Sequence, residues 1–182
     1  MSGTSQALTF ETSRLRLRGY ERSDLDVMAE MFGDAAVTAF TFLGRRDRAQ
    51  TAAVLDEYMA FLAERGYGML AILDRKSGEY LGEVGLFVSP MGPLALRYAL
   101  NQAAWGKGYA VEASAAVIED SFDRLGLDEL IAGVKPENKP SLRVMEKLGF
   151  VYDRTITEAG HTFGIYSVTR GGWKARRRQL SP

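Results

Sequence analysis

The chain has 182 residues, of which 46% are hydrophobic and 25% charged, proportions typical of a soluble globular protein. Its 23 lysine and arginine residues balance 23 aspartate and glutamate residues, so the net charge provides no general attraction to nucleic acid or to an anionic membrane. The absence of cysteine excludes a cysteine nucleophile and a cysteine-based metal site, and it fits a reducing, cytoplasmic compartment.

Domain organisation follows from the length and from the ends of the chain. We expect one domain over residues 9–173, preceded by a flexible N-terminus at residues 1–8 and followed by a basic C-terminal tail at residues 174–182. The tail is interpreted as a solvated end, and a weak nucleic-acid contact is the alternative. No stretch is long and apolar enough for a membrane span, and residues 1–6 lack a signal-peptide pattern. His161 is the single histidine, interpreted as exposed, and no metal site is expected.

The first hundred residues predict strands interrupted by two helices. Charged and apolar residues alternate at residues 14–18, as in a half-exposed strand, and apolar residues at helical spacing follow in two segments. In chain order the patterns predict a strand at 14–18, helices near 25–32 and 51–62, the second ending near Gly66, a hairpin of strands 69–73 and 80–88, and a strand at 94–100.

A long amphipathic helix dominates the second half. Its predicted apolar stripe consists of Val111, Ala115, Ile118, Phe122 and Leu125, widened by Ala110, Ala113 and Val117. Beyond it the patterns predict a strand at 130–134, a helix at 140–148 and a closing strand pair at 150–153 and 162–169. Because a helix separates the strands at 94–100 and 130–134, these two are expected to run parallel. The predicted fold class is α+β: a mixed, mostly antiparallel sheet of about seven strands, with helices on both faces and one parallel pair.

The segment WGKGYA at residues 105–110 joins a predicted strand to this helix. Its two glycines allow a ligand to approach the backbone, and the first amides of a helix have no acceptor within it. Together these features predict an anion site, most often one for phosphate. The segment lacks the G-x-x-x-x-G-K-[ST] of a P-loop, and Val111 stands where a dinucleotide-binding motif needs its third glycine.

Three segments together resemble the GCN5-related N-acetyltransferase (GNAT) superfamily, and within it the branch of ribosomal-protein N-terminal acetyltransferases. WGKGYA resembles the superfamily's Q/R-x-x-G-x-G/A with tryptophan first, PENKPS at 136–141 with EKLGF at 146–150 resembles N-x-x-S…E-K-x-G-F, and ETSRLRLR at 11–18 resembles the branch's opening. The likeness spans roughly residues 8 to 173. It implies the GNAT fold, acetyl-CoA as co-substrate, and acetyl transfer to an amine acceptor.

The resemblance also implies where acetyl-CoA binds. Amides of the glycine turn would hold its pyrophosphate, and its pantetheine arm would add as an extra strand between strands 94–100 and 130–134, which splay apart in the family. Asn138 would contribute a side-chain contact, the alternative being an ordinary turn or cap asparagine. The implied cofactor-binding residues are Leu100, Trp105, Gly106, Lys107, Gly108, Tyr109, Ala110, Asn138 and Ser141.

Two residues are candidates for catalysis. Glu83, flanked by Gly82 and Gly85 near the expected acceptor cleft, is the candidate general base, and a solvent-facing carboxylate is the alternative. Many relatives use a tyrosine seven residues after the asparagine to protonate the thiolate, but that position is Met145 here. The resemblance assigns Ser141 instead, whose hydroxyl would hydrogen-bond the sulfur, and helix capping is its alternative.

The acceptor is the least determined feature. Where the branch often shows E-x-G-Y, this chain has Ala95–Tyr98, and Arg97 there could attract an acidic peptide. Glu112 is interpreted as structural or bonded to a loop amide. An α-amine costs only about 1 kcal/mol to neutralise at pH 7, against roughly 4–5 for lysine. We therefore expect a peptide or protein α-amine. The alternatives are a small-molecule amine such as an aminoglycoside or polyamine, or a non-catalytic acyl-CoA-binding module. A homodimer is compatible with the sequence, and neither nucleic acid nor membrane is expected as a partner.

Overall fold

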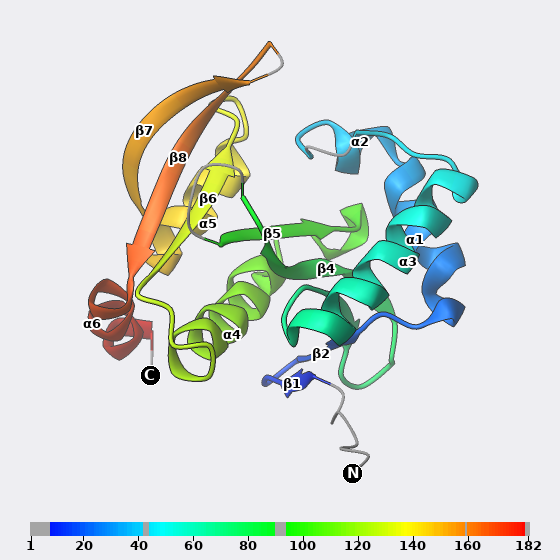
Figure 1. Cartoon of the computed structure of the whole chain (residues 1–182), viewed down its shortest axis with the longest axis horizontal. Coiled ribbons are helices and arrows are strands. Elements are labelled where there is room, and N and C mark those ends of the chain that lie inside the picture. Colours follow the sequence, from blue (N-terminus) through cyan, green and yellow to red (C-terminus); the bar gives the residue numbers. More distant parts are fainter. Residues whose placement is uncertain (1–7, 42–43, 90–93, 159, 181–182) are drawn as a thin grey trace.

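The computed structural model describes residues 8–41, 44–89, 94–158 and 160–180. These residues form one eight-stranded sheet with the order β1-β2-β3-β4-β5-β6-β8-β7 (Figure 1). The strands are β1 (Thr9–Glu11), β2 (Leu15–Gly19), β3 (Met69–Asp74), β4 (Tyr80–Phe87), β5 (Ala95–Leu100), β6 (Glu129–Val134), β7 (Val151–Glu158) and β8 (His161–Thr169).

Six α-helices accompany the sheet in the described part of the chain: α1 (Leu25–Gly33), α2 (Ala35–Thr38), α3 (Arg48–Arg65), α4 (Tyr109–Asp123), α5 (Lys139–Leu148) and α6 (Arg170–Leu180). Local sequence fixes their ends. Asp47 caps α3 by accepting from the Gln50 amide (2.8 Å), and Gly66 ends this helix in the left-handed conformation. The predicted end of the second helix near Gly66 is confirmed.

The predicted α+β class is confirmed, including the parallel pair. β5 and β6 are the parallel neighbours, and they register at one residue pair, Ala95 with Ile131. A further backbone hydrogen bond joins the Ile131 amide to the Leu94 carbonyl (3.2 Å). The sheet has eight strands instead of about seven because β1, at three residues, is too short to show an alternating pattern.

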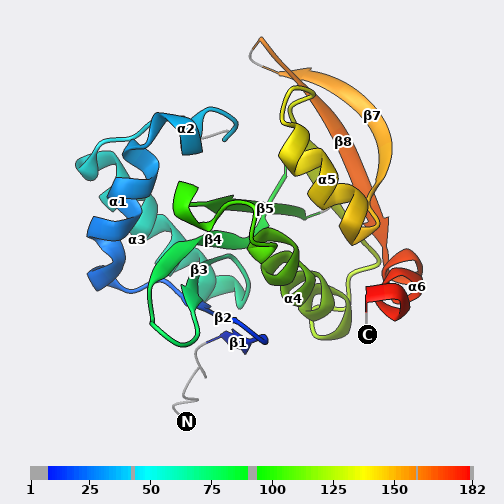
Figure 2. The ribbon, with the colours of Figure 1, turned by 180° about the vertical axis from the view of Figure 1, so that it is seen from behind.

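Helices cover both faces of the sheet. One core joins α4 and α5 to the sheet, with Ile118 and Phe122 of α4 almost fully buried. A second core lies under α1 and α3, centred on Met28, Phe32 and Leu55. Figure 1 shows α1 and α3 grouped at one side of the central strands and the β7–β8 hairpin at the other, and Figure 2 shows α4 and α5 from behind.

The buried face of α4 differs from the predicted stripe. Val111 and Ala115 are only half-buried and Leu125 lies beyond the end of α4 at Asp123, whereas Ala113 and Val117, which were expected to widen the stripe, lie at its centre. Two serines also face the core: Ser114 and Ser121 are fully buried, and the Ser121 hydroxyl donates to the Val117 carbonyl (2.6 Å). Small polar residues therefore shifted the face away from its purely apolar positions.

The C-terminal end of the chain is helical. The basic run at 174–178 lies within α6, which follows β8 directly. Trp173 buries its side chain in the core beneath α4 and α5, the Arg176 Nε donates to the Lys147 carbonyl (2.9 Å), and Arg177 forms an ion pair with Glu119. His161 is exposed at the start of β8, as predicted. Among the described helices, none has the length and hydropathy needed to cross a bilayer.

Candidate active site

A cavity of about 470 Å³ opens where β5 and β6 diverge, between α2, α4 and α5. Predicted site residues from three separate segments of sequence meet there. Those lining the cavity are Leu100, Trp105, Gly106, Gly108, Tyr109, Ala110, Asn138 and Ser141. Lys107 and Glu83 do not belong to the lining.

The glycine turn delivers backbone amides to this cavity. Gly106 and Gly108 have φ angles of +73° and +81°, which only glycine adopts without strain. The first helical hydrogen bond of α4 runs from the Glu112 amide to the Gly108 carbonyl (3.1 Å), so the amides of Tyr109, Ala110 and Val111 precede the helical ladder. The turn therefore has the geometry of an anion site at the positive end of a helix.

An ion pair braces this turn from outside, and we name it the Arg14–Glu112 clasp. The Arg14 Nη1 donates to the Lys107 carbonyl (2.9 Å), and the guanidinium lies over the Tyr109 ring, 4.6 Å from its centroid. The Arg14 Nε donates to the Glu112 Oε2 (2.7 Å). The clasp thus connects the segment before β2 to the glycine turn and to the first turn of α4.

Glu112 is the acceptor at the centre of the clasp. Its Oε1 accepts from the Thr12 hydroxyl (2.6 Å), the Ser13 hydroxyl (3.0 Å) and the Arg14 amide (2.9 Å). Desolvation alone would raise the pKa of Glu112, but these hydrogen bonds and the Arg14 side chain together lower it. The interpretation of Glu112 as a structural residue bonded to a loop amide is confirmed.

Trp105 and Leu100 connect the end of β5 to the turn. The Trp105 indole Nε1 donates to the Leu100 carbonyl (2.8 Å), while the ring remains 47% exposed at the cavity mouth. The tryptophan therefore fixes the start of the glycine turn relative to the last residue of β5.

At the start of α5, Asn138 is the capping residue. Its Oδ1 accepts from the Ser141 amide (3.2 Å), so the cap reading of Asn138 is observed although the residue also lines the cavity. Ser141 lies in the first turn and its side chain does not cap the helix. Its Oγ instead lies 2.8 Å from the hydroxyl of Tyr98 on β5.

Tyr98 is a site residue that the sequence reasoning did not identify. Strand alternation places Leu96, Tyr98 and Leu100 on the face toward α4, and Arg97 and Ala99 on the face toward α1 and α3. Burial raises the pKa of Tyr98 to about 12, despite the hydrogen bond to Ser141, which lowers it. The tyrosine was noted only as part of the unusual strand motif, and its partner is 43 residues away in sequence.

Glu83 lies behind the cavity wall. It is 1% exposed, and its Oε1 accepts from Arg97 Nη2 (3.0 Å) while the Tyr20 hydroxyl donates to its Oε2 (3.4 Å). Burial raises the pKa of Glu83, and the Arg97 guanidinium offsets this only in part. The solvent-facing alternative is therefore wrong. Arg97, which also hydrogen-bonds Tyr58, separates the carboxylate from the cavity that it lines.

The cavity wall is apolar and cationic. Four of its residues are basic, and the described residues that line it include no aspartate or glutamate; the cations are Arg97, Lys135, Arg143 and Lys147. This composition suits an occupant that carries phosphate groups.

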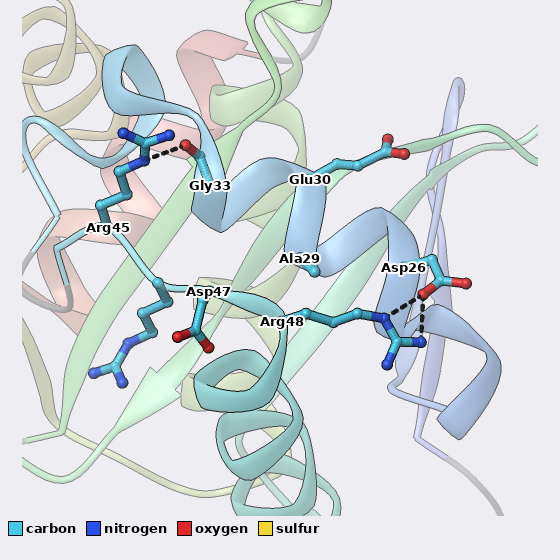
Figure 3. Close-up of a pocket in the computed structure, with 8 residues that line it drawn as sticks. Asp26, Ala29, Glu30, Gly33, Arg45, Asp47 and Arg48 are labelled. Atoms are coloured by element: carbon cyan, nitrogen blue, oxygen red, sulfur yellow. Dashed lines mark hydrogen bonds and ion pairs between the residues drawn. The ribbon is translucent and has the colours of Figure 1, made fainter.

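A second, wider hollow of about 720 Å³ lies between α1 and the start of α3 (Figure 3). Two of its arginines are held by neighbouring groups of the protein: the Arg45 Nε donates to the Gly33 carbonyl (2.7 Å), and Arg48 pairs with Asp26 (2.6 Å). None of the predicted site residues lies there, so the smaller cavity at the split sheet is the candidate active site.

A sheet that opens at one parallel pair, with a glycine turn feeding a helix at the opening, defines a class of acyl-CoA-dependent transferases. The family "Acetyltransferase (GNAT) domain" matches residues 14–151. The chain belongs to this family and is an acetyl-CoA-dependent N-acetyltransferase.

Similarity to individual proteins supports the same family assignment. An uncharacterized N-acetyltransferase p20 of Bacillus licheniformis is 30% identical over 145 residues, covering 78% of this chain and 82% of the relative. An acetyltransferase from Agrobacterium tumefaciens superimposes with a TM-score of 0.79 at 26% identity, covering 93% of this chain and 99% of the other. Two neighbours of lower identity share the fold. They are RimL, a ribosomal L7/L12 α-N-protein acetyltransferase solved with coenzyme A (TM-score 0.77, 16%, covering 89% and 98%), and a spermidine N-acetyltransferase from Vibrio cholerae solved with CoA and spermine (TM-score 0.76, 18%, covering 90% and 99%).

Proposed function

We propose that this enzyme acetylates the α-amine at the N-terminus of a peptide or protein. The observation that carries this proposal is the charge of the cavity wall on the α2 side, where Val37, Phe40, Phe87 and Arg97 lie and no described lining residue is acidic. Apolar side chains with one paired cation suit a single amine attached to a neutral or acidic peptide. They offer nothing to hold the additional positive charges of a polyamine.

Several predicted cofactor residues, together with three cations of the cavity wall, have a place in this proposal. The amides that follow Gly108 would accept the pyrophosphate, Lys135, Arg143 and Lys147 would balance its charge, and Trp105 and Leu100 would hold the turn against β5. Lys107 contributes through its carbonyl, which receives Arg14 and so keeps the turn folded. Bound acetyl-CoA supplies an activated thioester, and the chain supplies position and hydrogen bonds.

The remaining chemistry is the removal of one proton from the amine and stabilisation of the sulfur. An α-amine has a pKa of about 7.7–8.0, so a weak base is sufficient near neutral pH. Glu83 remains the predicted base: its raised pKa is favourable for this role, and because Arg97 separates it from the cavity and cannot pass on a proton, the proton would reach the carboxylate through water. Ser141 is proposed to donate its hydroxyl hydrogen bond to the sulfur of the leaving group.

The second candidate acceptor is a small-molecule amine. The spermidine N-acetyltransferase among the structural neighbours shows that this fold also serves polyamines. The lining argues against a polycation here, because its described residues include no aspartate or glutamate that could pair with the additional positive charges of a polyamine.

The test is an acetyl-transfer assay with acetyl-CoA and matched acceptors. We expect a peptide with a free α-amine to be acetylated, and the same peptide with a blocked N-terminus and an internal lysine to be inert. Spermidine and an aminoglycoside complete the panel, and mass spectrometry locates the acetyl group. A higher kcat/KM for spermidine than for every peptide would overturn the proposal.

A further inference from the structure

We propose that Tyr98 is a positioning residue that orients the Ser141 hydroxyl toward the sulfur of coenzyme A. This inference rests on the proposed role of Ser141 and adds to it a second residue, from another element of the fold. It concerns hydrogen bonding, and no covalent step is assigned to Tyr98.

The geometry places the two hydroxyls together inside the cavity. Tyr98 reaches from β5 and Ser141 from the first turn of α5, and their oxygens are 2.8 Å apart. Both residues line the cavity where β5 and β6 diverge. The pair therefore spans the opening from one wall to the other.

The proposed role of Ser141 decides which of the two hydroxyls donates in this hydrogen bond. A serine oxygen carries one proton and two lone pairs, and a tyrosine hydroxyl also carries one proton. If Ser141 donated to Tyr98, its only proton would be unavailable to a thiolate. If Tyr98 donates to Ser141, the serine proton is released toward the sulfur, and the accepted hydrogen bond polarises it further.

Other side chains near Ser141 cannot replace this function. Met145, one turn further along α5, is buried and has no proton to donate. The Asn138 oxygen accepts from the Ser141 amide and fixes the backbone, not the hydroxyl. Tyr98 is itself a poor acid because burial disfavours its ionised form. It therefore keeps its proton and acts through Ser141.

The activity experiment is a double-mutant cycle of Tyr98→Phe and Ser141→Ala. Tyr98→Phe is expected to lower kcat about tenfold, because one hydrogen bond is lost, while KM for acetyl-CoA changes little. Ser141→Ala should lower kcat about 100-fold, as for other lost transition-state donors. In the Ser141→Ala background, Tyr98→Phe should cost almost nothing further. Equal losses in both backgrounds would overturn the proposal.

A second readout needs no turnover. Thiolate absorbance of bound coenzyme A, titrated with pH, reports how well the site stabilises the charged sulfur. A hydrogen bond to the thiolate favours the ionised form, so the thiol should ionise at lower pH in the wild-type complex than free in solution. Tyr98→Phe should shift this ionisation back toward higher pH, and Ser141→Ala should shift it at least as far.

The control is Tyr152→Phe, which removes a tyrosine hydroxyl from a comparable pair. Tyr152 and Thr155 hydroxyls also lie 2.8 Å apart, but both residues are exposed on β7 and neither lines the cavity. This variant should leave both readouts unchanged. A Tyr98→Phe enzyme with an unshifted thiol titration and only lower stability would show a structural role and refute the inference. If instead wild type acetylates no peptide α-amine but the thiol titration responds as expected, the acceptor proposal fails and the Tyr98 inference stands.

Discussion

Gly108 combines two properties that no other residue supplies at the mouth of α4. Its φ of +81° lies in the left-handed region, and its lack of a side chain leaves the first amides of the helix accessible from the cavity. An added Cβ would also contact the Arg14 Nη2 at 3.5 Å, within the clasp. Gly108 thus determines the geometry of the turn, the access to the first amides of α4, and the space available to Arg14 of the clasp.

We predict that Gly108→Val raises KM for acetyl-CoA tenfold or more, since left-handed strain of about 1–2 kcal/mol adds to the obstruction of the amides. Steady-state kinetics and calorimetric titration with acetyl-CoA would measure this. Gly78→Val is the matched control: its φ is +74° in the β3–β4 turn, with open space around it. If both variants raised KM for acetyl-CoA by a similar factor, backbone strain alone would explain the effect, and obstruction of the amides would contribute nothing.

Glu83 gives a prediction in pH. Because burial raises its pKa, the carboxylate form that a base requires is lost as pH falls through that raised value, above the ordinary value of about 4.3. We expect kcat of the wild type to decline there, and Glu83→Gln to lower kcat about 100-fold and abolish the decline.

Thermal unfolding must accompany that measurement, because Glu83→Gln leaves the buried Arg97 without its counter-charge, a loss of about 3–5 kcal/mol. A folded variant with wild-type kcat would exclude Glu83 as the base and leave the ion pair as its only role.

Among the elements, β2, α4 and the glycine turn are joined by the Arg14–Glu112 clasp. We predict that Glu112→Gln destabilises the protein by about 1–3 kcal/mol at neutral pH, because a charged acceptor of several hydrogen bonds is lost. The pKa of Glu112 is lowered in the folded state, so its contribution is present above about pH 4.3 and disappears as pH falls through the lowered value.

Urea unfolding of the wild type and of Glu112→Gln, between neutral and acidic pH, tests whether the stability contributed by Glu112 falls with pH. The difference in free energy of unfolding between wild type and Glu112→Gln should narrow with acidification. Asp123→Asn, an exposed position on the same helix, provides the comparison. A difference that widens in acid would contradict the assigned pKa direction.

The elements that the sequence predicted are those whose signal is local. The helix ending at Gly66 and the β3–β4 hairpin follow from spacing and turn residues within a short window. The glycine turn is equally local. α6 was not predicted because its arginine-rich sequence has too few large apolar residues to form a stripe, although Trp173 is buried in the core.

The contacts within the site were harder to predict because they join distant segments. The clasp joins residues 98 apart, and the Tyr98–Ser141 pair joins residues 43 apart. Likewise, Glu83 could not be placed behind Arg97 until β4 and β5 were in register, with Glu83 paired to Ala99 beside Arg97. Residue types indicated the chemistry, but only the tertiary structure supplied these partners.

For the molecule as a whole, α6 closes the core on the side of α4 and α5. Trp173 is 3% exposed there, so Trp173→Ala should lower the free energy of unfolding by about 3–5 kcal/mol. Lys174→Ala, its exposed neighbour, should change it by no more than about 0.5 kcal/mol. Denaturant unfolding of both variants measures these changes. Equal free energies of unfolding for the two variants would mean that α6 does not stabilise the core.

The single registered pair between β5 and β6 divides the eight strands into a block of five and a block of three. A ligand whose extended arm hydrogen-bonds to both β5 and β6 would join the two blocks into one continuous sheet. Occupancy should then slow amide exchange along both facing edges and raise the melting temperature with concentration. Release of coenzyme A would remove these hydrogen bonds again. The contact between β5 and β6 would therefore become more rigid and then less rigid in each catalytic cycle.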